Sequence, residues 1–298
     1  MSRSRYRSDP GLAARMGLTM FLLGLLFVVL GVVLVNYFHT LGFILIAGFL
    51  VAQWFFSDRL ALYGMGGRVV TPEEAPELHG IVDRLCAIAD MPKPRVAIAD
   101  TDVPNAFATG RTAKKAVVCA TTGLMRRLDE RELEGVLSHE LSHVAHRDVT
   151  VMTIASFVGV LAGFLTRMVL WSGMGRRRDN NNGPPVWLIV LLVSVVVYAL
   201  SFLLTRALSR YRELAADRAG AFLTGQPSTL ASALVKISGE MARIPARDLR
   251  EVEPFNAFFF TPAISPGFSL SSIFSTHPPL NKRLDQLGRI ATELNRPS

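Results

Sequence analysis

Four apolar stretches stand out from the pattern of hydrophobic and polar positions along the chain. The first, at residues 18–35, carries no charged residue, and the second, at 41–56, follows after the short segment NYFHT. The third, at 150–171, is interrupted by Arg167, and the fourth, at 186–204, is free of charge. Because a helix needs about 20 residues to cross the hydrocarbon core of a bilayer, the pattern predicts four transmembrane helices in two hairpins.

The first stretch follows several arginines, as the apolar core of a signal peptide does. It is too long for that role, however, and shows no small-residue cleavage site. A second apolar stretch also follows it directly. We therefore interpret it as an uncleaved membrane anchor.

The remaining residues have the mixed composition of a water-exposed domain. We expect residues 1–57 to form an N-terminal hairpin and residues 150–204 to form a second hairpin inserted into that domain. The domain then has a first part at 58–149 and a second part at 205–298.

Local signals predict several elements in the first part. The segment TPEEAPELHGIVDRLCAIAD predicts a helix with Thr71 as N-cap, Pro72 at the first helical position and Glu74 closing a capping box. The segments RVAIAD, at 95–100, and KAVVCAT, at 115–121, predict two strands.

A longer amphipathic helix is predicted for LDERELEGVLSHELSHVAH, which has Asp129 as its cap and apolar residues at helical spacing. Further helical patterns lie around 206–224, 228–243 and 280–294. A flexible loop is expected at 172–185 and an irregular segment at 250–275. The predicted fold class is therefore a mainly α integral-membrane protein, in which a helical domain with a small β-sheet accompanies four transmembrane helices.

Composition supports a membrane protein. Half of the residues are hydrophobic and only 19% are charged, against about 25% in an average soluble domain. The net charge of +8 could indicate nucleic acid, but the arginines lie beside the apolar stretches, so we interpret them as membrane anchors and expect no nucleic-acid partner. Cys86 and Cys119 form neither a metal-binding spacing nor a disulfide framework, which fits a reducing compartment.

The distribution of arginines also predicts an orientation. Positive charge collects on the cytoplasmic side of membrane proteins. The segment before the first stretch is rich in arginine, whereas residues 36–40 hold no Lys or Arg, so we expect the water-exposed domain to face the cytoplasm. Arg176, Arg177 and Arg178, between the last two stretches, disagree with this rule if both stretches cross fully. Either the first hairpin sets the orientation and the second pair spans regardless, or the second pair dips into or lies against the membrane without crossing. The length of residues 186–204 and their lack of charge favour full crossing.

The candidate chemistry concentrates in HELSH, residues 139–143, on the predicted amphipathic helix. Residues four apart lie on one helix face, about 6 Å apart along the axis. His139 and His143 can therefore direct ring nitrogens at one metal ion. Glu140 lies beside that face, where its carboxylate can take a proton from an attacking water. The alternative, scattered histidines on a solvated helix, is less favoured than a zinc-dependent hydrolytic centre.

A third ligand must come from elsewhere, because catalytic zinc usually has three protein ligands. His146 faces the same way as His139 but lies about 10 Å along the helix axis, too far for one ion. Glu213, in SRYRELAADRAGAFL, is a better candidate, and Asp217, one turn later, could accept the free N–H of a ligand histidine. Taken alone these acids fit a solvated pair better, but beside HELSH the ligand interpretation is favoured.

Three segments carry a resemblance to a known family. HELSHVAHRD, YRELAADRAGA and STHPPLNKRL, with two apolar stretches between the first two and a hairpin in front, resemble the HtpX family of membrane-embedded zinc metalloproteases. That family is related to the CAAX prenyl proteases and belongs with the gluzincins. The resemblance covers nearly the whole chain. It implies a zincin-type domain with one zinc ion per chain, His139, His143 and Glu213 as ligands, and Glu140 as general base.

The resemblance also implies residues that handle the substrate. Asn105, Ala106 and Phe107 resemble the edge-strand segment with which gluzincins bind an extended peptide, although an ordinary turn leading into a strand is the alternative. His277, in STHPP, is a candidate donor to the oxyanion of the tetrahedral intermediate, and Arg283 is a candidate partner of His277. The sequence around His277 fits a helix start equally well.

The favoured function is an integral-membrane zinc endopeptidase that cleaves membrane or misfolded proteins, as part of the stress response at the cell inner membrane. A short chain with four predicted spans favours this quality-control role over a specialised processing protease of CAAX type. A non-catalytic membrane scaffold that keeps a zinc fold is a third hypothesis. It is disfavoured by Glu140, because a structural zinc site needs no base. The sequence leaves the oligomeric state open.

Overall fold

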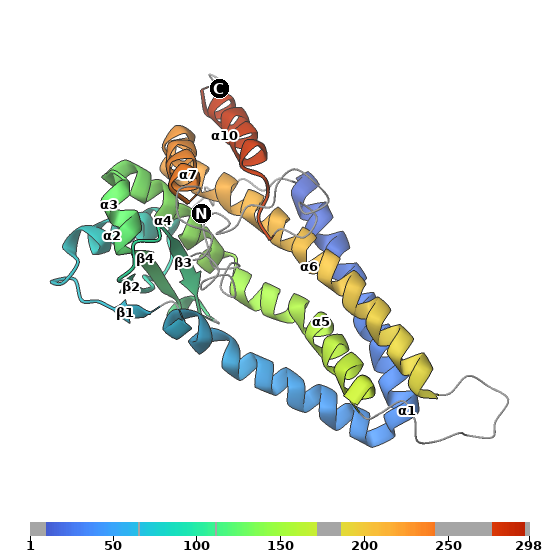
Figure 1. Ribbon diagram of the computed structural model, residues 1–298. Coiled ribbons are helices and arrows are strands. Elements are labelled where there is room, and N and C mark those ends of the chain that lie inside the picture. The colour runs from blue at the N-terminus through green and yellow to red at the C-terminus, as the bar shows by residue number, and fades with distance from the viewer. Residues whose placement is uncertain (1–9, 65, 111, 172–185, 242–275, 296–298) are drawn as a thin grey trace. The chain divides into compact units, whose positions relative to one another are not determined.

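The computed structural model describes residues 10–64, 66–110, 112–171, 186–241 and 276–295 (Figure 1). The flexible loop expected at 172–185 and the irregular segment expected at 250–275 lie outside the described residues. The chain is mostly helical with one small sheet, which confirms the predicted fold class.

Three long helices contain the apolar stretches: α1 (Pro10–Gly64), α5 (Asp148–Trp171) and α6 (Val186–Thr224). Within the described residues, 3 helices are long and apolar enough to cross a membrane, where the sequence predicted four. Most side chains of the second predicted stretch, 41–56, lie outside the described residues, and its backbone continues from the first stretch as helix through residues 36–40 in α1. Residues 36–40 contain neither Gly nor Pro, so nothing in them stops a helix. The ribbon of α1 nevertheless turns back to give two arms (Figure 1).

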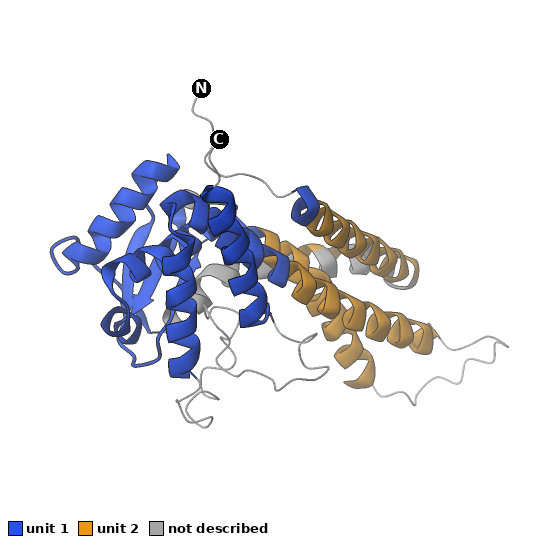
Figure 2. Ribbon diagram, turned by 90° about the horizontal axis from the view of Figure 1, so that it is seen from above, with its two compact units in different colours: residues 1–13, 58–150, 209–298 blue, residues 14–57, 151–208 orange. Residues whose placement is uncertain are grey.

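The chain divides into two compact units, coloured separately in Figure 2. Unit 2 comprises residues 14–57 and 151–208, and unit 1 comprises residues 1–13, 58–150 and 209–298. In unit 2, Gly159 and Gly163 let α5 pack closely on α6. A Cβ at Gly159 would lie 3.0 Å from Ser201 Oγ, and one at Gly163 would lie 3.2 Å from the Tyr198 ring. Small residues at such spacing are the usual means of close packing between membrane helices.

Unit 1 contains a four-stranded sheet with the order β1-β2-β4-β3. The strands are β1 (Gly67–Val69), β2 (Arg95–Ala99), β3 (Ala106–Thr109) and β4 (Val117–Thr121). β2 and β4 are parallel, whereas β1 and β3 pair antiparallel to their neighbours. β2 and β4 confirm the two strands predicted from sequence. Every residue of β4 is buried, as expected for an apolar central strand.

Strand β3 lies at the edge of this sheet, with β4 as its neighbour. The amide of Thr121 donates to the carbonyl oxygen of Asn105 at 2.9 Å. Because hydrogen-bonded and non-hydrogen-bonded pairs alternate in an antiparallel ladder, the backbone N–H and C=O groups of Ala106 and Ala108 point away from β4.

Helix α2 (Pro76–Ala89) begins later than predicted. The capping-box contacts between Thr71 and Glu74 do form, with the Thr71 amide donating to Glu74 Oε2 at 2.8 Å, but they close a turn before the helix. Pro76 explains the difference, because a proline disfavours the helical conformation at the residue before it. Ala75 accordingly has φ −143° and ψ 64°.

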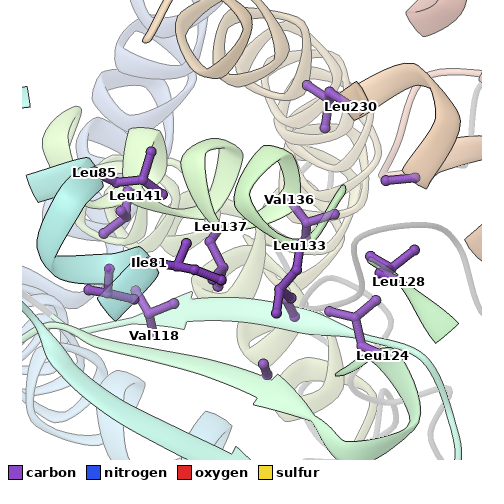
Figure 3. Close-up of a cluster of buried hydrophobic side chains, with 14 of the residues drawn as sticks. Ile81, Leu85, Val118, Leu124, Leu128, Leu133, Val136, Leu137, Leu141 and Leu230 are labelled. Carbon is purple, nitrogen blue, oxygen red and sulfur yellow. The ribbon is translucent and has the colours of Figure 1, made fainter. Parts of the chain in front are cut away.

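Helix α4 (Glu130–Ala145) carries HELSH and confirms the predicted amphipathic helix. Asp129 caps it and forms a full capping box with Glu132. Its apolar face packs between α2 and the sheet, where Leu137 and Leu141 lie close to Ile81 and Leu85 (Figure 3). Each buried leucine stabilises the fold by roughly 1.5–3 kcal/mol, so this core fixes the position of α4.

The remaining elements complete unit 1. They are η1 (Ala113–Lys115), α3 (Thr122–Arg127), α7 (Pro227–Met241) and α10 (Leu280–Leu294). α7 packs against both α4 and α10. Three helices confirm the patterns predicted for the second part of the domain. The pattern at 206–224 is the C-terminal part of α6, the one at 228–243 is α7, and the one at 280–294 is α10.

Candidate metal centre

Three side chains from two helices converge in unit 1. His139 and His143 come from successive turns of α4, and Glu213 comes from α6. Their candidate ligand atoms all lie within 4.8 Å of one another. The two Nε2 atoms are 3.1 Å apart, and Glu213 oxygens lie 3.7 Å from His139 Nε2 and 3.5 Å from His143 Nε2.

This donor set fits a zinc ion. Tetrahedral zinc with Zn–N bonds of about 2.0–2.1 Å places its ligand atoms about 3.3 Å apart. The nitrogen–nitrogen and nitrogen–oxygen separations lie close to that value, and the rings of His139 and His143 meet edge to face. Two imidazoles and a carboxylate are also the ligands that a catalytic zinc site commonly uses.

Asp217 contacts His139, and Arg283 in turn contacts Asp217. Asp217 Oδ1 lies 2.9 Å from His139 Nδ1. Arg283 donates to both oxygens of Asp217, at 2.6 and 2.7 Å, and its own side chain is only 2% exposed. The ion pair with Asp217, working against desolvation, holds the pKa of Arg283 above its ordinary value. Asp217 thus lies between His139 and Arg283, in contact with both side chains.

His143 has a comparable pair of partners that the sequence did not single out. Asp148 Oδ2 lies 2.7 Å from His143 Nδ1, and the other oxygen of Asp148 contacts the guanidinium of Arg212. Both partners are buried. The only available sequence signal was the position of these charges, one at the start of an apolar helix and one directly before Glu213.

Glu140 lies beside the three candidate ligands and is 5% exposed. Burial raises the pKa of its carboxyl to about 8, the charge of Glu213 adds to this effect, and His143 and a hydrogen bond from the Ala108 backbone oppose it. Glu140 lies on α4, which packs against β3. A carboxyl group with a pKa near neutrality can both accept and return a proton at neutral pH.

Gly220 lets α6 approach α4 at this site. A Cβ at this position would lie 2.9 Å from Ser138 Oγ and 3.0 Å from the amide nitrogen of His139. Any larger residue would push the two helices apart. Gly220 therefore sets the separation between the helix that carries Glu213 and the helix that carries both histidines.

The other residues proposed from sequence occupy different positions around the centre. His277 is buried, with Nδ1 3.1 Å from Glu213 Oε2. Asn105, Ala106 and Phe107 lead into and form the edge strand β3, but all three side chains are buried. His146 is the exposed C-cap residue of α4 and does not belong to the group of candidate ligands.

The sequence also matches known proteins over most of its length. Residues 72–291 match the model of peptidase family M48. Protease HtpX homolog 1 of Streptomyces coelicolor is 59% identical over 295 residues, which cover 98% of this chain and 97% of that protein. A protease HtpX homolog of Moorella thermoacetica is 54% identical over 300 residues, covering 98% of each chain.

The fold also matches a solved structure. The crystal structure of S. mikatae Ste24p superimposes with a TM-score of 0.56 at 16% identity, covering 94% of this chain and 67% of that chain. At this low identity the likeness concerns the fold alone.

Proposed function

Because the chain belongs to peptidase family M48, a family of metallopeptidases, we propose that it is a membrane-embedded zinc endopeptidase with one zinc ion per chain. The ligands in this proposal are His139, His143 and Glu213. The observation that carries it is the convergence of their ligand atoms within 4.8 Å, beside the buried carboxyl of Glu140. The apolar helices α1, α5 and α6 make the chain a membrane protein.

Glu140 is the proposed general base. When bound, zinc polarises the scissile carbonyl and lowers the pKa of the attacking water. Glu140 would accept a proton from that water and pass it to the leaving amine.

The edge strand β3 is the proposed binding surface for the substrate. The backbone groups of Ala106 and Ala108 point away from β4, and Ala108 is the partly exposed residue of the strand, so we propose that an extended peptide donates to the carbonyl oxygen of Ala108, whose amide faces Glu140. Asn105 and Phe107 direct their backbone groups toward β4, and both are buried together with Ala106, so we assign these three residues to the strand that carries the surface and not to direct contact with the substrate.

His277 is the proposed donor to the oxyanion. Its Nδ1 lies 3.1 Å from Glu213, which orients the ring next to the ligand set. The other ring nitrogen is the atom that would stabilise negative charge on the tetrahedral intermediate. Arg283, 3.7 Å from the same carboxylate, adds positive charge nearby.

The proposed substrates are misfolded or damaged membrane proteins. A processing protease of CAAX type is the second candidate, because the Ste24p fold covers 94% of this chain. A peptidase that binds substrate along an exposed strand edge selects for extended backbone more than for one terminal sequence. This argument favours the quality-control role.

We predict that the detergent-solubilised protein cleaves an unfolded protein such as β-casein at internal bonds and does not cleave a prenylated peptide ending in a CAAX sequence. Mass spectrometry of the products of both reactions measures this directly. Cleavage of the prenylated peptide alone would instead support the processing role. Lack of cleavage of either substrate, with zinc bound, would support a non-catalytic scaffold.

We also propose that the catalytic domain faces the cytoplasm, following the excess of arginine before the first apolar stretch. A cysteine introduced at the exposed Lys114 should then react with an impermeant maleimide only after the cells are opened. The native Cys86 and Cys119 are buried, so we expect them to contribute little labelling of their own. An Asn181→Cys variant should react on intact cells, since α5 and α6 are both long enough to span. Labelling of Lys114→Cys on intact cells would show that the catalytic domain faces the outside of the cell.

A further inference from the structure

Asp148 is the first residue of α5 and contacts His143. α4 and α5 are joined by only His146 and Arg147, and Arg147 has a φ of 56°, in the left-handed region. This conformation is uncommon for a residue other than glycine and costs about 1 kcal/mol. The tight turn carries Asp148 back to His143, where Oδ2 lies 2.7 Å from Nδ1.

Arg212 holds the other oxygen of Asp148. It lies on α6 directly before Glu213, and its side chain is only 6% exposed. Removing either member of a buried carboxylate–guanidinium pair destabilises the fold, because the remaining charge is left unpaired in a low-dielectric environment. Asp148 therefore links His143 on α4 to the helix segment that carries Glu213.

The same arrangement serves the other histidine. His139 Nδ1 faces Asp217, and Asp217 is held by Arg283. Each histidine of HELSH thus has its own buried aspartate, and each aspartate has its own buried arginine. Two such pairs, built from different helices, serve the same geometric purpose of directing the two Nε2 atoms to one point.

We propose that Asp148 and Arg212 are positioning residues for the metal centre. Asp148 accepts the Nδ1 hydrogen of His143, which fixes the tautomer whose Nε2 lone pair faces the metal. Arg212, through its contact with the other carboxylate oxygen, fixes the rotamer of Asp148. This inference rests on the proposed role of His143 as a metal ligand.

Asp148→Asn provides the decisive variant. With its amide oxygen on Arg212, asparagine presents its NH₂ group to His143 Nδ1, which favours the tautomer with its proton on Nε2. We expect zinc affinity, measured by competition with a chelator of known affinity, to fall by about 10- to 100-fold. Asp148→Glu, which keeps the charge, should recover part of the loss.

Glu132→Gln is the matched control. Glu132 is a buried acid on the same helix, α4, and pairs with Lys236 and Ser232 away from the candidate ligands. Its replacement should lower the thermal unfolding temperature but leave zinc affinity within about twofold of the original protein. If Asp148→Asn proves too unstable to purify, Arg212→Lys tests the same contact with the charge retained, and it should also weaken zinc binding.

The outcomes separate this inference from the proposed function. If the original protein binds zinc and His143→Ala abolishes that binding, His143 is a ligand. Unchanged zinc affinity in folded Asp148→Asn would then overturn only the role of Asp148. If His143→Ala binds zinc as well as the original protein does, the ligand assignment itself is wrong.

Discussion

Replacing Glu140 with glutamine is expected to lower the rate of β-casein cleavage by at least about 1,000-fold while zinc content stays near one per chain. Glutamine has the same shape but cannot accept the proton of the attacking water. It leaves His139 and His143 in place, because Glu140 lies beside the candidate ligands and is not one of them. Cleavage assays and metal analysis on the same purified sample measure both effects.

Glu134→Gln is the control for this substitution. Glu134 lies on the same helix and pairs with Arg84 at the surface, away from the centre. Its replacement should leave the cleavage rate within about twofold, since exposed ion pairs contribute roughly 0–1 kcal/mol to stability. Full activity of Glu140→Gln would show that another group acts as the base.

The second large effect is expected for Glu213→Ala. Two histidines alone do not complete the ligand set of a catalytic zinc site, so zinc content should fall below about a tenth of an equivalent after dialysis, and cleavage should be lost. His146→Ala should keep its zinc, because His146 lies outside the group of candidate ligands. Metal analysis by plasma mass spectrometry distinguishes the two variants. Loss of zinc from His146→Ala, with retention in Glu213→Ala, would contradict the ligand assignment.

The sequence predicted the elements whose signals are local. Helix α4 was predicted with its cap, because the Asp129 cap and the apolar spacing lie within the helix itself. The strands β2 and β4 were predicted from short apolar runs. The start of α2 was wrong, since Pro76 outweighs the capping signal at Thr71. Strand β1 was missed, because it is three residues long and depends on pairing with β2.

The candidate site shows the same division. His139 and His143 share a face because of helical periodicity, which the sequence displays directly. The contact of Asp148 with His143 depends on the left-handed conformation of Arg147. An arginine in the sequence does not predict that conformation. The contact of Asp148 with Arg212 joins residues 64 positions apart in the sequence, on α5 and α6, so it depends on tertiary folding. Such partners become visible only once the chain is folded.

The central claim is that a bound zinc ion makes this chain a protease. The most direct test measures β-casein cleavage by the detergent-solubilised protein before metal removal, after removal with a chelator, and after addition of one equivalent of Zn²⁺. We predict full loss of cleavage on removal and recovery on addition, with the protein folded throughout by circular dichroism. Undiminished cleavage by protein that retains less than about 0.05 equivalents of any divalent metal would contradict the account.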